Sequence, residues 1–108
     1  MAEAGNKPRS RVLKQRFITN QIFLLVNKNH HQPLAKPIIY YRISKKAVSK
    51  AVDRNLLKRR FREIMREYKD KISLGTVLSI GVSENIVKKP FKQLKTDLKL
   101  TLTKAHLL

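Results

Sequence analysis

Cysteine is absent from this chain of 108 residues, which excludes a disulfide framework, a thiolate nucleophile and a cysteine-based zinc site. Long apolar runs are missing too. The longest, residues 22–26, has the length of a strand, whereas a membrane-spanning helix needs ~18 apolar residues or more. The first ten residues are polar and lack the pattern of a secretory signal. We therefore expect a cytoplasmic protein that does not bind a membrane.

Acidic residues are scarce, with 7 Asp and Glu against 25 Lys and Arg, and the formal net charge is +18. A chain of this length forms one domain, so barrel enzymes and two-domain dinucleotide enzymes, which need roughly 200 residues or more, are excluded. An apolar fraction of 42% is enough for one small core. The composition predicts a folded domain that binds a polyanion.

Residues suited to catalysis are few and scattered. The three glycines form no glycine-rich phosphate loop, and the seven carboxylates form no cluster of the kind that holds Mg²⁺. His30 and His31 are adjacent and His106 lies near the end of the chain, so they are poorly placed to act as acid and base around one phosphate. We expect no catalytic residue and no metal site in the chain itself.

The spacing of apolar residues predicts a single domain over residues 16–108, after residues 1–15 that are loose or form a short helix. Polar residues and two prolines indicate a loop at 28–37. The predicted strands are 16–27, 38–44 and 76–83, and the predicted helices lie within 47–69 and at 90–107. This order predicts an α+β fold, a two-layer α/β sandwich in which helices pack on a small central sheet. Segment 38–83 would form a parallel crossover, right-handed by the general rule.

The long helix shows the clearest sorting of side chains. On a helical wheel one side is apolar, and the other carries arginines and lysines. The apolar stripe does not include Ala47, Val48, Ala51 and Val52, so we expect the chain to turn near Ser49 or Lys50 before the helix settles. The predicted stripe consists of Leu57, Phe61, Ile64 and Tyr68.

Positive charge is concentrated in residues 42–71, which hold twelve of the 25 cations and four acids. Arg54, Lys58 and Arg62 stand at i, i+4 and i+8, where like charges repel in the free protein. A phosphate backbone would offset this repulsion, and arginine suits bidentate phosphate contacts. A merely solvated face and an anionic membrane surface are weaker alternatives. DNA is not expected as the partner, because no dimerisation element is visible.

The stretch from Ser44 to Glu63, SKKAVSKAVDRNLLKRRFRE, resembles the signature of the bacterial ribonuclease P protein subunit. That family has Ser-Lys-Lys at a strand end, a short turn, Ala-Val-x-Arg-Asn, and then Lys-Arg and a further Arg along a helix. The order of elements from about residue 17 to 108 also resembles the family. The matching positions are Ser44, Lys45, Lys46, Ala51, Val52, Arg54, Asn55, Lys58, Arg59 and Arg62.

The resemblance implies a subunit that assists a catalytic RNA in removing the 5′ leader from precursor tRNA. In such a ribonucleoprotein the RNA supplies the endonuclease active site and holds Mg²⁺. The basic helix and its adjoining turn would contact the catalytic RNA through Lys45, Lys46, Lys50, Arg54, Asn55, Lys58, Arg59, Arg62 and Arg66. The family's strand–helix–strand crossover is left-handed, against the general rule. A small basic ribosomal protein that binds rRNA, or a DNA-binding regulator, is the alternative.

The resemblance also implies a cleft for the single-stranded leader, formed by a sheet face and an N-terminal helix. We assign Phe17, Leu24 and Val26 to this cleft. The chain departs from the family pattern in having Leu56 where a basic residue is common, and in having no aromatic residue before Phe17. The first strand also lacks the tyrosine that often ends it in the family. Of Tyr40 and Tyr41, one must face the core, because strand neighbours alternate.

Overall fold

The computed structural model describes residues 15–28 and 36–108. This part of the chain forms a four-stranded sheet with strand order β2-β3-β5-β4. The strands are β2 (Gln15–Thr19), β3 (Ile22–Lys28), β4 (Ile38–Tyr41) and β5 (Thr76–Val82). The helices are α1 (Ala51–Tyr68), the short 3₁₀ helix η2 (Lys69–Lys71) and α2 (Phe91–Lys104).

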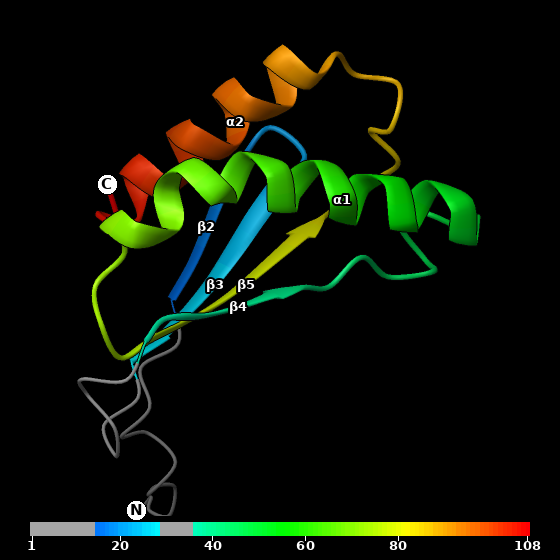
Figure 1. Ribbon diagram of the computed structural model, residues 1–108. Helices are drawn as coiled ribbons and strands as arrows, with labels where there is room; N and C mark the ends of the chain where they lie inside the picture. Colours follow the sequence, from blue (N-terminus) through cyan, green and yellow to red (C-terminus); the bar gives the residue numbers. More distant parts are fainter. Residues whose placement is uncertain (1–14, 29–35) are drawn as a thin grey trace, which may run out of the picture.

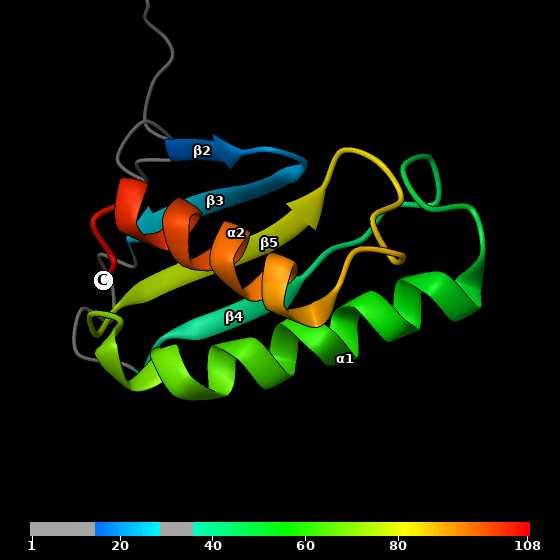
Figure 2. The ribbon, with the colours of Figure 1, turned by 90° about the horizontal axis from the view of Figure 1, so that it is seen from above.

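Both α-helices lie on the same face of the sheet (Figure 1). Viewed from above, α2 lies over the sheet and α1 runs alongside β4 (Figure 2). Strands β2, β3 and β5 are antiparallel neighbours, whereas β4 pairs with β5 in parallel, with α1 between them in the chain. The α+β class, the two layers and the parallel crossover are therefore confirmed. The hand of the crossover stays a prediction.

The first predicted strand, 16–27, is wrong in one respect, because the structure divides it into a hairpin. Thr19 pairs with Ile22, so only Asn20 and Gln21 connect β2 to β3. Asn20 has a φ of 55°, a left-handed conformation that asparagine tolerates better than most residues. Apolar residues stand on both sides of this turn, so hydrophobic spacing alone did not reveal it.

A polar cluster holds the hairpin to α2. The carboxylate of Asp97, 1% exposed, accepts hydrogen bonds at Oδ1 from Asn20 Nδ2 and Gln93 Nε2, each at 2.9 Å. Lys89 Nζ lies 3.5 Å from Asp97 Oδ2 and also donates to Gln21 Oε1. A buried carboxylate is costly without such partners. The cluster therefore offsets that cost and ties the hairpin turn to the helix layer.

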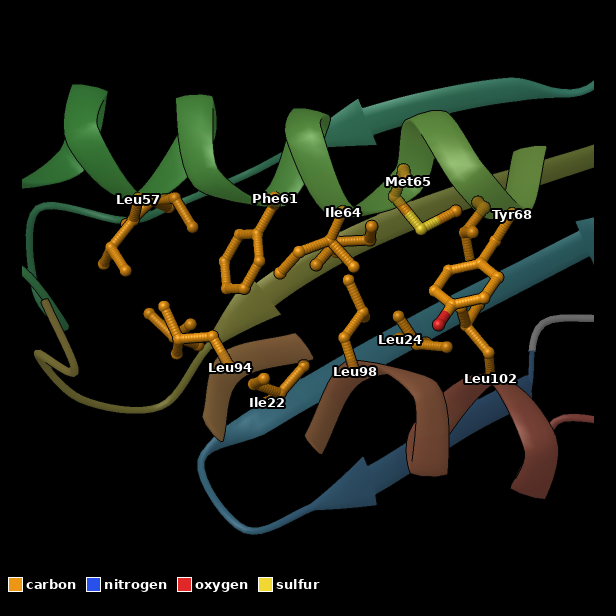
Figure 3. Close-up of a cluster of buried hydrophobic side chains, with 14 of the residues drawn as sticks. Ile22, Leu24, Leu57, Phe61, Ile64, Met65, Tyr68, Leu94, Leu98 and Leu102 are labelled. Carbon is orange, nitrogen blue, oxygen red and sulfur yellow. The ribbon is translucent and has the colours of Figure 1, made fainter. Parts of the chain in front are cut away.

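The hydrophobic core lies between the sheet and the two helices (Figure 3). Helix α1 contributes the four predicted residues, Leu57, Phe61, Ile64 and Tyr68, together with Met65. Burying a side chain of this size stabilises the fold by about 1.5–3 kcal/mol. The other helix and the central strands supply Leu94, Leu98, Leu102, Ile22, Leu24, Leu78 and Ile80.

The boundaries of the remaining predicted elements need small corrections. Helix α1 begins at Ala51, after a turn as predicted, and Val52 at its start is 75% exposed. Strand β4 ends at Tyr41 rather than residue 44. Gln15, assigned to the loose N-terminus, begins β2. The short N-terminal helix lies otherwise outside the described residues, as does the loop over 29–35. No helix in the described part is long and apolar enough to cross a membrane.

Candidate RNA interface

Ser44 builds the turn that precedes α1. Its side-chain Oγ accepts a hydrogen bond from the backbone N–H of Ala47 at 3.1 Å, and its carbonyl accepts one from the N–H of Val48 at 3.0 Å. Serine favours such local bonds over a continued strand. The turn buries Val48 and leaves Lys45 and Lys46 exposed. The Ser-Lys-Lys part of the motif thus presents two cations on a backbone held by its own serine.

Arg54 has a structural role that the sequence did not reveal. Its Nη1 donates to the carbonyl oxygens of Val48 at 3.0 Å and Ser49 at 2.8 Å. The guanidinium therefore joins the turn to the first turns of α1. Arginine carries five N–H donors, so others on the same side chain remain available for a phosphate.

Beyond Arg54, the outer side of α1 carries a row of cations. Arg59, Arg62 and Asn55 are exposed and Lys58 is partly so, while Leu57 and Phe61 face the core. Arg66 lies 3.5 Å from Glu63, an exposed ion pair one turn away. Within residues 15–28 and 36–108, no carboxylate pairs with Lys45, Lys46, Lys50, Lys58 or Arg59. The basic stripe is defined here as the predicted set Lys45, Lys46, Lys50, Arg54, Asn55, Lys58, Arg59, Arg62 and Arg66.

Arg60 points away from this stripe. Its Nη1 donates to the carbonyl of Val87 at 2.6 Å. Asp53 nearby accepts a hydrogen bond from Asn85 Nδ2 at 3.1 Å. These two contacts hold the segment between β5 and α2 against α1. Arg60 therefore supports the fold and does not extend the stripe.

The assignment of Leu24 and Val26 to a leader cleft is wrong. Leu24 is 0% and Val26 6% exposed, because both face the helices. Phe17 pairs with Leu24 and packs against the same core. Both faces of β3 are apolar, so the sequence could not tell which face the helices cover. Alternation then places Phe23 and Leu25 on the opposite face.

We call this opposite side of the sheet the outer face. Within the described residues no helix covers it (Figure 1). Tyr40 and Ile38 at one edge are each 43% exposed. Gly81 leaves room for the Phe23 ring, since a Cβ at that position would come within 2.5 Å of the ring atom Cζ. Strand register assigns Arg16, Ile18, Phe23, Leu25, Asn27, Ile38, Tyr40, Val77 and Ser79 to the outer face.

Cations accompany two aromatic rings on the outer face. The guanidinium of Arg16 lies 5.0 Å from the centroid of Phe23, and that of Arg42 lies 4.8 Å from the centroid of Tyr40. Tyr40 is exposed and Phe23 partly so, and accessible rings beside guanidinium groups are typical of surfaces on which single-stranded bases stack. The signal for Tyr40 was the alternation of the strand. Alternation alone did not show whether Tyr40 or Tyr41 faces the core. The pairing of β4 with β5 places Tyr40 on the outer face.

The described residues offer no group of three or more His, Asp or Glu that could hold a metal ion. Their carboxylates are largely engaged elsewhere. Asp97 is buried in the hairpin cluster, and Glu67 pairs with Lys95. A protein-held Mg²⁺ requires several free oxygen ligands around one point. The arrangement of these acids does not fit such a site. His30 and His31 lie outside the described residues.

Comparison with protein families gives a match to the ribonuclease P family over residues 11–106. The fold is similar to that of the ribonuclease P protein from Staphylococcus aureus, at 21% identity and a TM-score of 0.75, covering 87% of this chain and 83% of that one. It is also similar to the ribonuclease P protein from Thermotoga maritima, at 22% identity and a TM-score of 0.71, covering 84% and 83%. A comparison with curated protein sequences found no significant match.

The family match does not favour the ribosomal or DNA-binding alternatives. It spans nearly the whole described domain and includes the basic stripe. The chain therefore belongs to the bacterial ribonuclease P protein family, as a protein subunit of an RNA-based holoenzyme in which the partner RNA carries out metal-dependent catalysis.

Proposed function

We propose that the basic stripe binds the catalytic RNA, and that the outer face binds the 5′ leader of precursor tRNA. The observation that carries this proposal is the row of cations on α1 and its preceding turn, of which only Arg66 has an acidic partner within the described residues. Each Lys or Arg that neutralises a phosphate releases counterions from the RNA. The stripe would therefore supply affinity that falls steeply as salt rises.

The outer face supports the second half of the proposal by its shape and chemistry. It lies across the sheet from the core, so it is separate from the helix layer that carries the stripe (Figure 1). Single-stranded RNA is commonly bound by stacking its bases on exposed aromatic rings and arginines. Phe23 and Tyr40, with Arg16 and Arg42 beside them, are the side chains that we assign to this contact.

Mg²⁺ is the metal that we propose for the catalysis, held by the RNA. The protein would help indirectly, because its cations lower the repulsion between RNA strands that share the same metal ions. A cytoplasmic location accords with an RNA partner and a chain that lacks cysteine.

The direct experiment is a reconstitution of purified protein with a bacterial ribonuclease P RNA and a precursor tRNA. Cleavage is measured at low Mg²⁺ and moderate salt, with each component omitted in turn. We expect cleavage at the mature 5′ end that requires the RNA and is stimulated by the protein. Cleavage by the protein alone, or no stimulation despite tight RNA binding, would contradict the proposal.

A matched pair of variants assigns the RNA surface. Arg59→Gln removes one cation from the stripe, and Lys92→Gln removes one exposed cation from α2. Both change the net charge equally. We expect only Arg59→Gln to weaken binding to the ribonuclease P RNA markedly. Equal effects of the two variants would mean that overall charge, and not the stripe, drives binding.

A further inference from the structure

A groove runs between β4, the edge strand of the sheet in the described residues, and the C-terminal half of α1. In the view from above, α1 runs along the β4 side of the sheet (Figure 2), and residues of both elements line the groove. The groove consists of two adjoining hollows of about 360 and 400 Å³ that share Pro37, Ile39 and Lys69. Hollows of this size are within the range of small-ligand sites.

The hollow nearer the middle of α1 combines an apolar floor with a basic rim. Ile39, Tyr41 and Met65 form the floor. The cations of the rim are Arg62, Arg66 and Lys69, and Pro37 completes the lining. Such a combination suits a ligand that has a flat apolar part and a negative charge. A nucleotide has both.

Tyr41 is the residue that distinguishes this groove from the outer face. It pairs with Ile80 and lies on the helix side, whereas its neighbour Tyr40 pairs with Ser79 on the outer face. The guanidinium of Arg62 lies 5.6 Å from the centroid of the Tyr41 ring. Burial raises the pKa of Tyr41 and the nearby Arg62 offsets this only in part, so its hydroxyl remains a hydrogen-bond donor at neutral pH.

We propose that this groove receives an unpaired nucleotide of the RNA that covers α1, with its base against Tyr41 and Ile39 and its phosphate near Arg66 and Lys69. The proposal rests on the proposed function, in which that RNA is the catalytic RNA. Arg66 is available at small cost, because its pair with Glu63 is exposed and exposed pairs are weak. The contact would place a stacking site at the margin of an otherwise electrostatic interface.

The test measures the affinity of Tyr41→Leu for a bacterial ribonuclease P RNA over a range of salt concentrations. Loss of one base–ring contact should weaken binding by roughly tenfold or more. The dependence on salt should stay unchanged, because no cation is removed. Tyr41→Phe keeps the ring and should bind within a few-fold of the parent protein. Tyr40→Leu, on the opposite face, should not alter this affinity.

The same experiment separates the two proposals. If Arg59→Gln weakens binding and folded Tyr41→Leu does not, the groove proposal is overturned and the basic stripe stands. If neither variant changes binding, the groove proposal and the proposed function are both overturned. Undiminished affinity of Tyr41→Leu would leave the groove to another occupant, such as a peptide strand added to the edge of β4.

Circular dichroism shows whether Tyr41→Leu folds. If it does not, a crosslinking experiment tests the proposal. Ribonuclease P RNA that contains 4-thiouridine is irradiated in complex with Tyr40→Leu, in which Tyr41 is the remaining tyrosine of β4. We expect a crosslinked peptide that contains residue 41. Crosslinks confined to other peptides would overturn the proposal.

Discussion

Arg54 reaches back from α1 and donates a hydrogen bond to the carbonyl oxygen of Val48 at 3.0 Å. A residue of the basic stripe therefore also holds the turn that presents Lys45 and Lys46. The two roles have different consequences when a side chain is removed. Comparing Arg54 with Arg59 separates the two roles. Arg54 holds the turn, whereas Arg59 belongs to the same stripe and has no ion pair within the described residues.

We expect Arg54→Ala to lower the free energy of unfolding by about 1–3 kcal/mol, because two backbone carbonyls lose a charged donor. It should also weaken binding to the ribonuclease P RNA. Arg59→Ala should leave stability within ~0.5 kcal/mol. It should reduce the salt dependence of RNA binding by about one phosphate contact. Urea denaturation and filter binding provide the two measurements, and equal stability of both variants would contradict the role assigned to Arg54.

Leu24 and Leu25 are neighbours on β3 that face opposite sides of the sheet. Leu24→Ala should cost roughly 2–5 kcal/mol of stability, because Leu24 is fully buried in the core. Leu25→Ala should cost less and should weaken the preference of the holoenzyme for precursor tRNA over mature tRNA. Thermal unfolding measures the stability of both variants. Competition between precursor tRNA and mature tRNA measures the preference of the holoenzyme. A leader defect in folded Leu24→Ala, without one in Leu25→Ala, would reverse the assignment of the faces.

Asp97 is the centre of the hairpin cluster. Asp97→Ala removes the buried carboxylate that accepts hydrogen bonds from the amides of Asn20 and Gln93, and a hydrogen bond to a charged group contributes about 1.5–3 kcal/mol. We expect a large loss of stability, measured by urea denaturation. Hydrogen exchange should show that the N–H groups around the Asn20 turn open more readily. An unchanged midpoint of unfolding would mean that the cluster contributes little.

Glu67 on α1 and Lys95 on α2 form an exposed ion pair between the helices. The hydrogen bond and charge of Lys95 lower the pKa of the Glu67 carboxyl, and Glu67 in turn raises the pKa of Lys95. The contribution of Glu67 is therefore present above its unfolded-state pKa and is lost as the pH falls through its lowered pKa. That of Lys95 is lost as the pH rises through its raised pKa.

Lys95→Gln should therefore raise the pKa of Glu67 toward its ordinary value, as followed by NMR titration of the carboxyl carbon. Added salt should do the same in the parent protein, because exposed charges are screened. Overall stability should change little. A Glu67 titration that is insensitive to both changes would show that the pair does not form in solution.

The sequence by itself determined the class of fold and the character of the partner. Apolar spacing predicted α1, α2 and β5 to within a few residues, because regular helices and strands repeat with fixed periods. The excess of cations between Arg42 and Lys71 predicted a polyanion, since charge depends on composition and not on packing. The spacing of the motif from Ser44 to Arg62 identified the family.

Only the tertiary structure decided which side of each apolar strand faces the helices. Strand β3 is apolar on both faces, so local spacing is equally consistent with Leu24 or Leu25 inside. Contact with the helix layer buries one face, and within the described residues no helix covers the other. The same holds for Arg54 and Arg60, whose donors bind carbonyls of other segments at 2.6–3.0 Å. Such partners are brought together by folding, and their distance along the chain does not reveal them.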